Sequence, residues 1–156
     1  MENALTTSEL QKKLEYYCAY QERCHQEVVQ KLWSLGVPGS QQDELLVHLI
    51  THNFLNEERF AQTFVLSKFH QKKWGKIRLK NELKQRQLNE RLIKQALNTI
   101  PEEEYETTFQ QLAEKTWETL KGTNTLLKQK KFCDSLLRKG WESDRVYAIL
   151  KQLMHN

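Results

Sequence analysis

The chain has 156 residues, of which 38% are hydrophobic and 28% charged, and its formal net charge is +4. The presence of only 5 Gly and 2 Pro argues against long strand-and-turn stretches, and the lack of any run of about 18 apolar residues argues against a membrane-spanning helix. This composition predicts an all-α protein whose thin core is distributed along an elongated stack of helices.

Apolar residues that recur at helical spacing predict nine helices. The fourth follows the capping residue Asn56 and carries Phe60 and Phe64 on one face. The seventh follows Pro101 and begins with three glutamates, which complement the helix dipole. The expected helices span residues 7–21, 24–35, 40–52, 57–73, 76–86, 89–99, 102–121, 124–139 and 143–154.

Three segments overlay without gaps, and they start at Leu32, Leu83 and Leu136. The fourth residue after each leucine is a glycine or, in the middle copy, Gln87, and an apolar residue follows. Glycine suits the left-handed end of a helix, so the turn at Gln87 is expected to differ slightly. The agreement predicts three tandem three-helix, helix-turn-helix-like repeats that form an elongated curved stack. The expected repeats are residues 1–53, 54–100 (basic) and 101–156, with N-caps at Ser40, Asn89 and Ser143.

The charges are segregated along the chain. Residues 1–59 hold 5 Lys or Arg against 9 Asp or Glu, whereas residues 68–94 hold ten basic residues against two acidic ones. Lys76, Lys80 and Lys84 recur every four residues and share one helix face. A solvated helix face is the ordinary explanation of a charge run, but so one-sided a run favours a surface for a polyanion or an acidic partner, with salt-sensitive binding. The candidate basic surface comprises Lys68, Lys72, Lys73, Lys76, Arg78, Lys80, Lys84 and Arg86.

Nothing in the sequence indicates a catalytic centre. His48 and His52 have a metal-compatible spacing, but no third ligand is suggested nearby, and the glutamate of hydrolytic zinc helices is missing. Cys24 and His25 are neighbours, so their side chains diverge and do not form a nucleophile–base pair. We therefore expect no catalytic residue, no metal and no cofactor. Three cysteines without a CxxC pair argue against a disulfide framework and favour a cytoplasmic protein.

The four tryptophans could act as stacking platforms for bases. Trp33, Trp117 and Trp141 lie at apolar positions of a repeat or a helical stripe, so core packing is the favoured interpretation. Trp74 lies at the turn between two helices, where it could be either a packing wedge or a contact residue.

Two stretches in the middle of the chain form a recognisable pattern, residues 53–61 (NFLNEERFA) and residues 75–88, with the KKWG segment leading into the second. These stretches resemble the RecX family of RecA regulators, and the likeness extends more loosely through residues 16–50 and 126–153. Two departures are that Asn56-Glu57 stand where many members have two aspartates and that Gln87 replaces a glycine. The motif residues with an expected structural role are Glu57, Arg59, Phe60, Ala61, Trp74 and Gly75.

The resemblance implies a non-enzymatic regulator in homologous recombination, DNA repair and the SOS response. Its partner would be the RecA–single-stranded-DNA filament, with contacts to DNA phosphates, and it would inhibit or modulate ATPase, strand exchange and coprotease activity. Two alternatives stay open, a direct helix-turn-helix-like DNA-binding protein and a helical-repeat adaptor for another protein. A monomer is the default expectation.

Overall fold

The structure is a computed structural model, and it describes residues 5–122 and 125–155. Within these ranges the chain forms helices and connecting loops with no strand, and no helix there is long and apolar enough to cross a membrane. The helices are α1 (Thr7–Tyr20), α2 (His25–Ser34), α3 (Gly39–Thr51), α4 (Glu57–Lys72), α5 (Lys76–Gln85), α6 (Glu90–Leu97), α7 (Glu102–Thr119), α8 (Leu126–Arg138) and α9 (Ser143–Met154).

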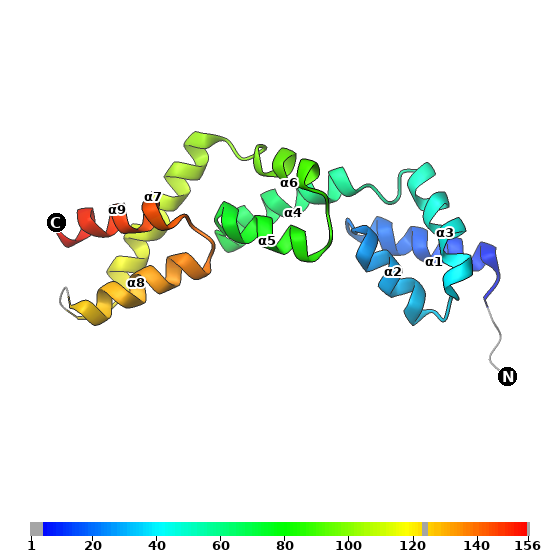
Figure 1. Cartoon of the computed structure of the whole chain (residues 1–156), viewed down its shortest axis with the longest axis horizontal. Helices are drawn as coiled ribbons and strands as arrows, with labels where there is room; N and C mark the ends of the chain where they lie inside the picture. The colour runs from blue at the N-terminus through cyan, green and yellow to red at the C-terminus, as the bar shows by residue number, and fades with distance from the viewer. Residues whose placement is uncertain (1–4, 123–124, 156) are drawn as a thin grey trace.

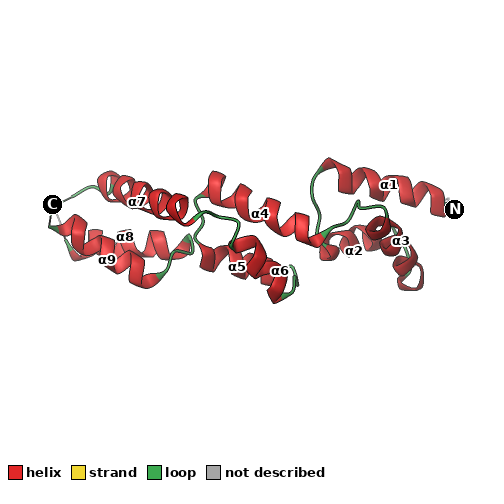
Figure 2. Cartoon of the chain, turned by 90° about the horizontal axis from the view of Figure 1, so that it is seen from above, coloured by secondary structure: helices red, strands yellow, loops and turns green. Residues whose placement is uncertain are grey.

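The helices follow one another along an elongated molecule with the two chain ends at opposite extremes (Figure 1). Figure 2 shows the long helices α1, α4 and α7 in a row along one side, with the pairs α2–α3, α5–α6 and α8–α9 below them. The predicted fold class, three tandem three-helix repeats in an all-α stack, is confirmed. The helix bounds agree with the expected ones to within a few residues.

The turn inside each pair has the same backbone in all three repeats. Gly36, Gln87 and Gly140 adopt left-handed φ values of 75°, 63° and 95°. The next residue is buried, and its N–H donates to the carbonyl five residues back at 3.0, 3.3 and 3.2 Å. The expected difference at Gln87 is therefore not seen. Gln87 adopts the left-handed conformation although its side chain makes that conformation more costly than it is for glycine.

The N-caps lie at one register position, two residues beyond the left-handed residue. Asn89 caps α6 as predicted, and its side chain accepts a hydrogen bond from the N–H of Leu92 at 2.9 Å. The predicted caps Ser40 and Ser143 are wrong, because α3 is capped by Pro38 and α9 by Glu142. The tight turn starts each helix before the serine is reached, and the side chain of Glu142 instead accepts a hydrogen bond from Tyr105.

The buried side chains form two cores rather than three. Helices α1, α2 and α3 enclose one cluster, which includes Leu14, Leu32 and Leu49. Helices α4 to α9 share a second, continuous cluster, to which Cys24 of the first repeat also belongs. The second and third repeats are thus packed into one body, whereas the first repeat carries a core of its own. The repeat boundaries after residues 53 and 100 remain a proposal.

The second and third repeats meet where two turns touch backbone to backbone. The N–H of Gly75 donates to Lys139 O at 2.8 Å, and the N–H of Ile77 donates to Gly140 O at 3.1 Å. A Cβ on Gly75 would lie 2.4 Å from Gly140 O, so only glycine allows this approach. Trp141 is buried beside this contact, and its indole N–H donates to Lys73 O at 3.0 Å.

The first and second repeats are joined by polar contacts at the start of α4. Arg59 Nε donates to both carboxylate oxygens of Glu22 at 2.7 and 2.8 Å, and its Nη2 donates to the carbonyl of Asn53 at 3.0 Å. Glu57 accepts a hydrogen bond from the N–H of His25 at 3.1 Å, at the N-terminus of α2. This charge-assisted clamp fixes the loop before α2 against the start of α4.

Of the three tryptophans expected in the core, two are packed there and one is exposed. Trp141 is fully buried, and Trp117 packs edge-on against Phe132 with ring centroids 5.5 Å apart. The prediction that Trp33 is a core residue is wrong, since its side chain is 59% exposed. It lies at an apolar repeat position, but that position faces outward on α2, where Gly39 of α3 packs beside its ring.

Candidate functional site

The basic residues of α5 form two rows on opposite sides of the helix. Residues four apart lie almost above one another, so Leu79 and Leu83 make a buried row between the two basic ones. Lys76, Lys80 and Lys84 flank it on the side of α6. The other row comprises Arg78 and Arg86, with Glu82 between them in sequence. The eight predicted residues therefore do not make one patch.

The first row lines a groove of about 340 Å³ between α5 and α6, which we name the lysine groove. Ile93 and Leu97 supply apolar lining, whereas Glu90 is an acidic residue of its rim. The groove is lined by Lys76, Lys80, Lys84, Glu90, Ile93, Lys94, Leu97 and Asn98. Four ammonium groups around a half-apolar groove can bind phosphate or carboxylate groups, each as a point charge.

The lysines of this groove are not equivalent. Lys76 is half-buried, with its Nζ 4.7 Å from the ring centroid of Tyr105 and 3.5 Å from a carboxylate oxygen of Glu102. Lys80, Lys84 and Lys94 are exposed, and none of them pairs with a carboxylate among residues 5–122 and 125–155. Three of the four charges are therefore available to an anionic partner.

The second row belongs to a layer of stacked aromatic and cationic side chains. Arg78 lies over the ring of Trp74 at 4.1 Å, and Arg86 lies over the ring of Phe64 at 4.7 Å. Lys68 Nζ is within 6 Å of both rings, at 5.8 Å from Phe64 and 5.6 Å from Trp74. Trp74 is half-buried and packed against the core, so it resembles a wedge more than a free stacking platform.

Both arginines of this row are also engaged in ion pairs. Arg86 donates to the carboxylate of Glu82 at 3.0 Å, and Arg78 lies 3.9 Å from the same carboxylate. Arg78 further donates to the carbonyl of Arg138 at 3.3 Å, which ties it to the turn of the third repeat. These contacts hold the second row in place and reduce its free charge.

Lys72 and Lys73 lie at the end of α4, apart from both rows. Lys73 is the left-handed C-cap, with φ 58°, and its carbonyl accepts the hydrogen bond from Trp141. The carbonyl of Lys72 lies 3.5 Å from Lys139 Nζ. Their backbones therefore serve the junction between repeats, while their side chains are exposed.

Sequence reasoning missed Lys94 as a member of the site. Lys94 belongs to the basic stretch 68–94, but its spacing in sequence does not relate it to Lys84, because the two residues lie on different helices. Only the packing of α6 against α5 brings them to one groove. The four-residue spacing of Lys76, Lys80 and Lys84 identifies one wall of the groove but not the other.

The histidine pair contacts other side chains, and the three cysteines are buried. His48 lies 3.1 Å from a carboxylate oxygen of Glu15, and the rings of His48 and His52 are 4.4 Å apart between centroids. No group of three or more His, Cys, Asp or Glu that could hold a metal occurs among the described residues. Burial raises the pKa of Cys18 and Cys24 to about 11, so neither is a ready nucleophile at neutral pH.

Comparison with known proteins identifies relatives of this arrangement. A family model described as "RecX, second three-helix domain" matches residues 56–97. A "Regulatory protein RecX" of Prosthecochloris aestuarii is 29% identical, with 90% of each chain covered. The protein of the same name from Leuconostoc mesenteroides is 30% identical over 82% of this chain and 48% of its own.

Solved structures show the same fold. The crystal structure of RecX from Lactobacillus salivarius matches with a TM-score of 0.79 and 25% identity, and the match covers 94% of this chain and 95% of that one. A second structure, of a regulatory protein RecX, matches with a TM-score of 0.78 and 23% identity. The chain spans about half the length of several curated relatives, for example 51% of the protein from Bacillus cytotoxicus.

Proposed function

Since the chain belongs to the RecX family, we propose that it binds the RecA–single-stranded-DNA filament and inhibits or modulates RecA ATPase, strand exchange and coprotease activity. It acts as a regulator and not as an enzyme, in the cytoplasm and as a monomer. The observation that carries the proposal is that the matched second domain, residues 56–97, is the part of the chain that holds the lysine groove.

An elongated stack of helices is better suited to binding a filament than to binding a compact protein. Tandem helical repeats present extended surfaces, on which one chain can contact several neighbouring subunits at once. A chain that bridges subunits opposes the rearrangements that ATP hydrolysis and strand exchange require. The exposed lysines of the groove would meet DNA phosphates or acidic side chains on the filament, and binding would weaken as salt is raised.

The test is the DNA-dependent ATPase activity of RecA, measured against added protein at two salt concentrations. The variant Lys80→Glu with Lys84→Glu changes two exposed groove residues and spares Lys76, which contacts Tyr105. At roughly 0.7 kcal/mol per charge, half-inhibition should require about tenfold more of the variant.

The matched control is Lys115→Glu with Lys151→Glu, which reverses two exposed lysines on α7 and α9. It should inhibit like the unchanged protein. If the groove variant and the control reach half-inhibition at the same protein concentration, the lysine groove is not the contact surface. A lack of inhibition by the unchanged protein at both salt concentrations would refute the proposal itself.

Direct binding to DNA remains the second candidate, because α2–α3, α5–α6 and α8–α9 are helix pairs joined by tight turns. A gel shift on single- and double-stranded DNA without RecA separates this function from filament binding. A pull-down with and without the filament identifies an adaptor for another protein.

A further inference from the structure

The first repeat carries a second concentration of positive charge. A groove of about 580 Å³ lies between α1 and α2, and we name it the tyrosine groove. Although residues 1–59 are acidic in total, four of their five basic residues line this groove. The lining residues are Lys12, Lys13, Tyr16, Tyr17, Tyr20, Arg23, Lys31 and Leu35.

Three acidic residues of α1, α2 and the loop between these helices are engaged in other contacts. Glu15 contacts His48 at 3.1 Å, and Glu22 pairs with Arg59 at 2.7 Å. Glu27 accepts a hydrogen bond from the N–H of Cys24 at 3.1 Å. In contrast, the four cations of the groove have no carboxylate within 4.0 Å among the described residues. The groove thus presents uncompensated positive charge.

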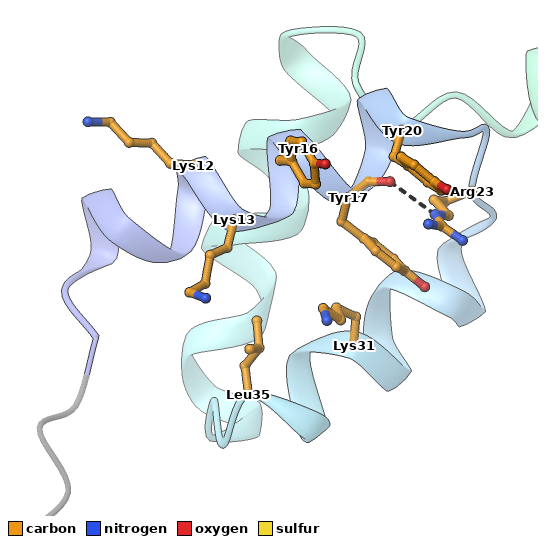
Figure 3. A pocket seen from close by; sticks show the side chains of 8 residues that line it. All are labelled: Lys12, Lys13, Tyr16, Tyr17, Tyr20, Arg23, Lys31 and Leu35. Carbon is orange, nitrogen blue, oxygen red and sulfur yellow. Dashed lines mark hydrogen bonds between the residues drawn. The ribbon is translucent and has the colours of Figure 1, made fainter.

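Aromatic rings line the groove between these cations, as Figure 3 shows. Tyr16 and Tyr20 are 71% and 72% exposed, and their ring centroids are 6.4 Å apart. Tyr17 lies deeper, with Arg23 Cζ 3.8 Å and Lys31 Nζ 5.3 Å from its ring centroid. Arg23 is further fixed by a hydrogen bond from its Nε to Tyr17 O at 3.0 Å.

Single-stranded nucleic acid is bound by exposed aromatic rings that lie beside cations without a carboxylate partner. Every base has a π-face that can stack on a tyrosine, and the backbone places a phosphate beside each base. An acidic peptide would satisfy the cations but would leave two large exposed rings without a partner of matching chemistry. We propose that the tyrosine groove binds single-stranded nucleic acid, with bases stacked on Tyr16 and Tyr20 and phosphates at Lys12, Lys13 and Lys31.

This inference goes beyond the proposed function, because it assigns a single-strand site to the groove between α1 and α2, whereas the DNA-binding candidate above rests on the helix pairs. It also assigns to the first repeat a binding role that the acidic total of residues 1–59 conceals. The tyrosine groove lies on the first repeat, whereas the lysine groove lies on the second. A strand in the tyrosine groove is therefore bound at a different repeat.

The experiment is fluorescence anisotropy of a labelled oligo-dT strand titrated with the full chain. Tyr16→Ala with Tyr20→Ala should weaken binding at least about tenfold, because stacking contributes substantially for each base. The same variant should bind an abasic strand of equal length as tightly as the unchanged chain does. Lys12→Glu with Lys13→Glu should weaken binding to both strands and reduce the slope of log K against log salt by about 1.4.

All variants are repeated with Lys80→Glu and Lys84→Glu, so that binding in the lysine groove does not hide the effect. The control Tyr147→Ala with Lys151→Glu removes an exposed tyrosine and an exposed lysine from α9 and should leave binding unchanged. An unaltered affinity of the tyrosine variant for oligo-dT would overturn the proposal, as would an equal loss in the control. Competition by poly-glutamate as effective as that by oligo-dT would also overturn it, in favour of an acidic protein partner.

Discussion

Replacing Gly75 by alanine should separate the third repeat from the second. The backbone φ of Gly75 is −78°, a value that alanine adopts without strain, so the change introduces no conformational penalty of its own. The added Cβ would lie 2.4 Å from Gly140 O and 2.7 Å from Trp141 N. Both are backbone atoms, so the two turns must move apart.

The expected loss follows from the contacts that this movement breaks. Among the hydrogen bonds that join the turns, three lie closest to Gly75 in the contact, from Gly75 N to Lys139 O, from Ile77 N to Gly140 O and from the indole of Trp141 to Lys73 O. At about 1 kcal/mol each, their loss lowers the free energy of unfolding by about 3 kcal/mol. For a chain of this size that corresponds to a fall in Tm of roughly 6–12 °C.

The assay is thermal unfolding followed by circular dichroism, together with tryptophan emission in the native state. Emission should shift to longer wavelength as buried Trp141 becomes hydrated. Gly39→Ala is the matched control, because a Cβ there meets only side-chain atoms of Trp33 at 3.6 Å and beyond. If Gly75→Ala proves as stable as Gly39→Ala, the close approach does not hold the repeats together.

Two further predictions concern the helix-ending turn and the thiols. Gln87→Gly should raise the free energy of unfolding, measured by urea titration, by up to about 1 kcal/mol. The reason is that Gln87 has a left-handed φ of 63°, which costs a non-glycine residue about that much. A decrease in the free energy of unfolding would contradict this prediction. Burial raises the pKa of Cys18 and Cys24 from 9.0 to about 11, so the folded chain keeps protons that the unfolded chain releases. Stability should therefore be lost as pH rises from about 9 to about 11, and Cys18→Ala with Cys24→Ala should remove that part of the dependence.

The sequence was sufficient for the elements and their repetition. Helix periodicity and the recurring leucine–glycine turn located all the helices of the described chain to within a few residues. Both signals are local, since a left-handed residue and a buried neighbour act within one turn of the chain. The N-caps at Ser40 and Ser143 failed because polar caps recur by chance near a helix start, and the turn geometry places the cap one or two residues earlier.

The arrangement of the basic residues on α5 could be predicted from the sequence only in part. The four-residue spacing of Lys76, Lys80 and Lys84 correctly puts them on one face, but it does not reveal that Arg78 and Arg86 lie across the buried row, engaged with Trp74 and Phe64. Net charge was equally uninformative for the first repeat. Its acidic total conceals a basic groove, because Glu15 and Glu22 pair with His48 and Arg59 and not with the cations of the groove.

The amino-acid sequence by itself determined the helical class, the threefold repetition and the family, because these depend on periodicity and short motifs. The tertiary structure alone decided that two repeats share one core while the first has its own, and that Gly75 and Gly140 bring two turns into backbone contact. It also decided which charges remain free. Each of these depends on residues far apart in the chain, and the distance between such residues is set by packing and not by their spacing in sequence.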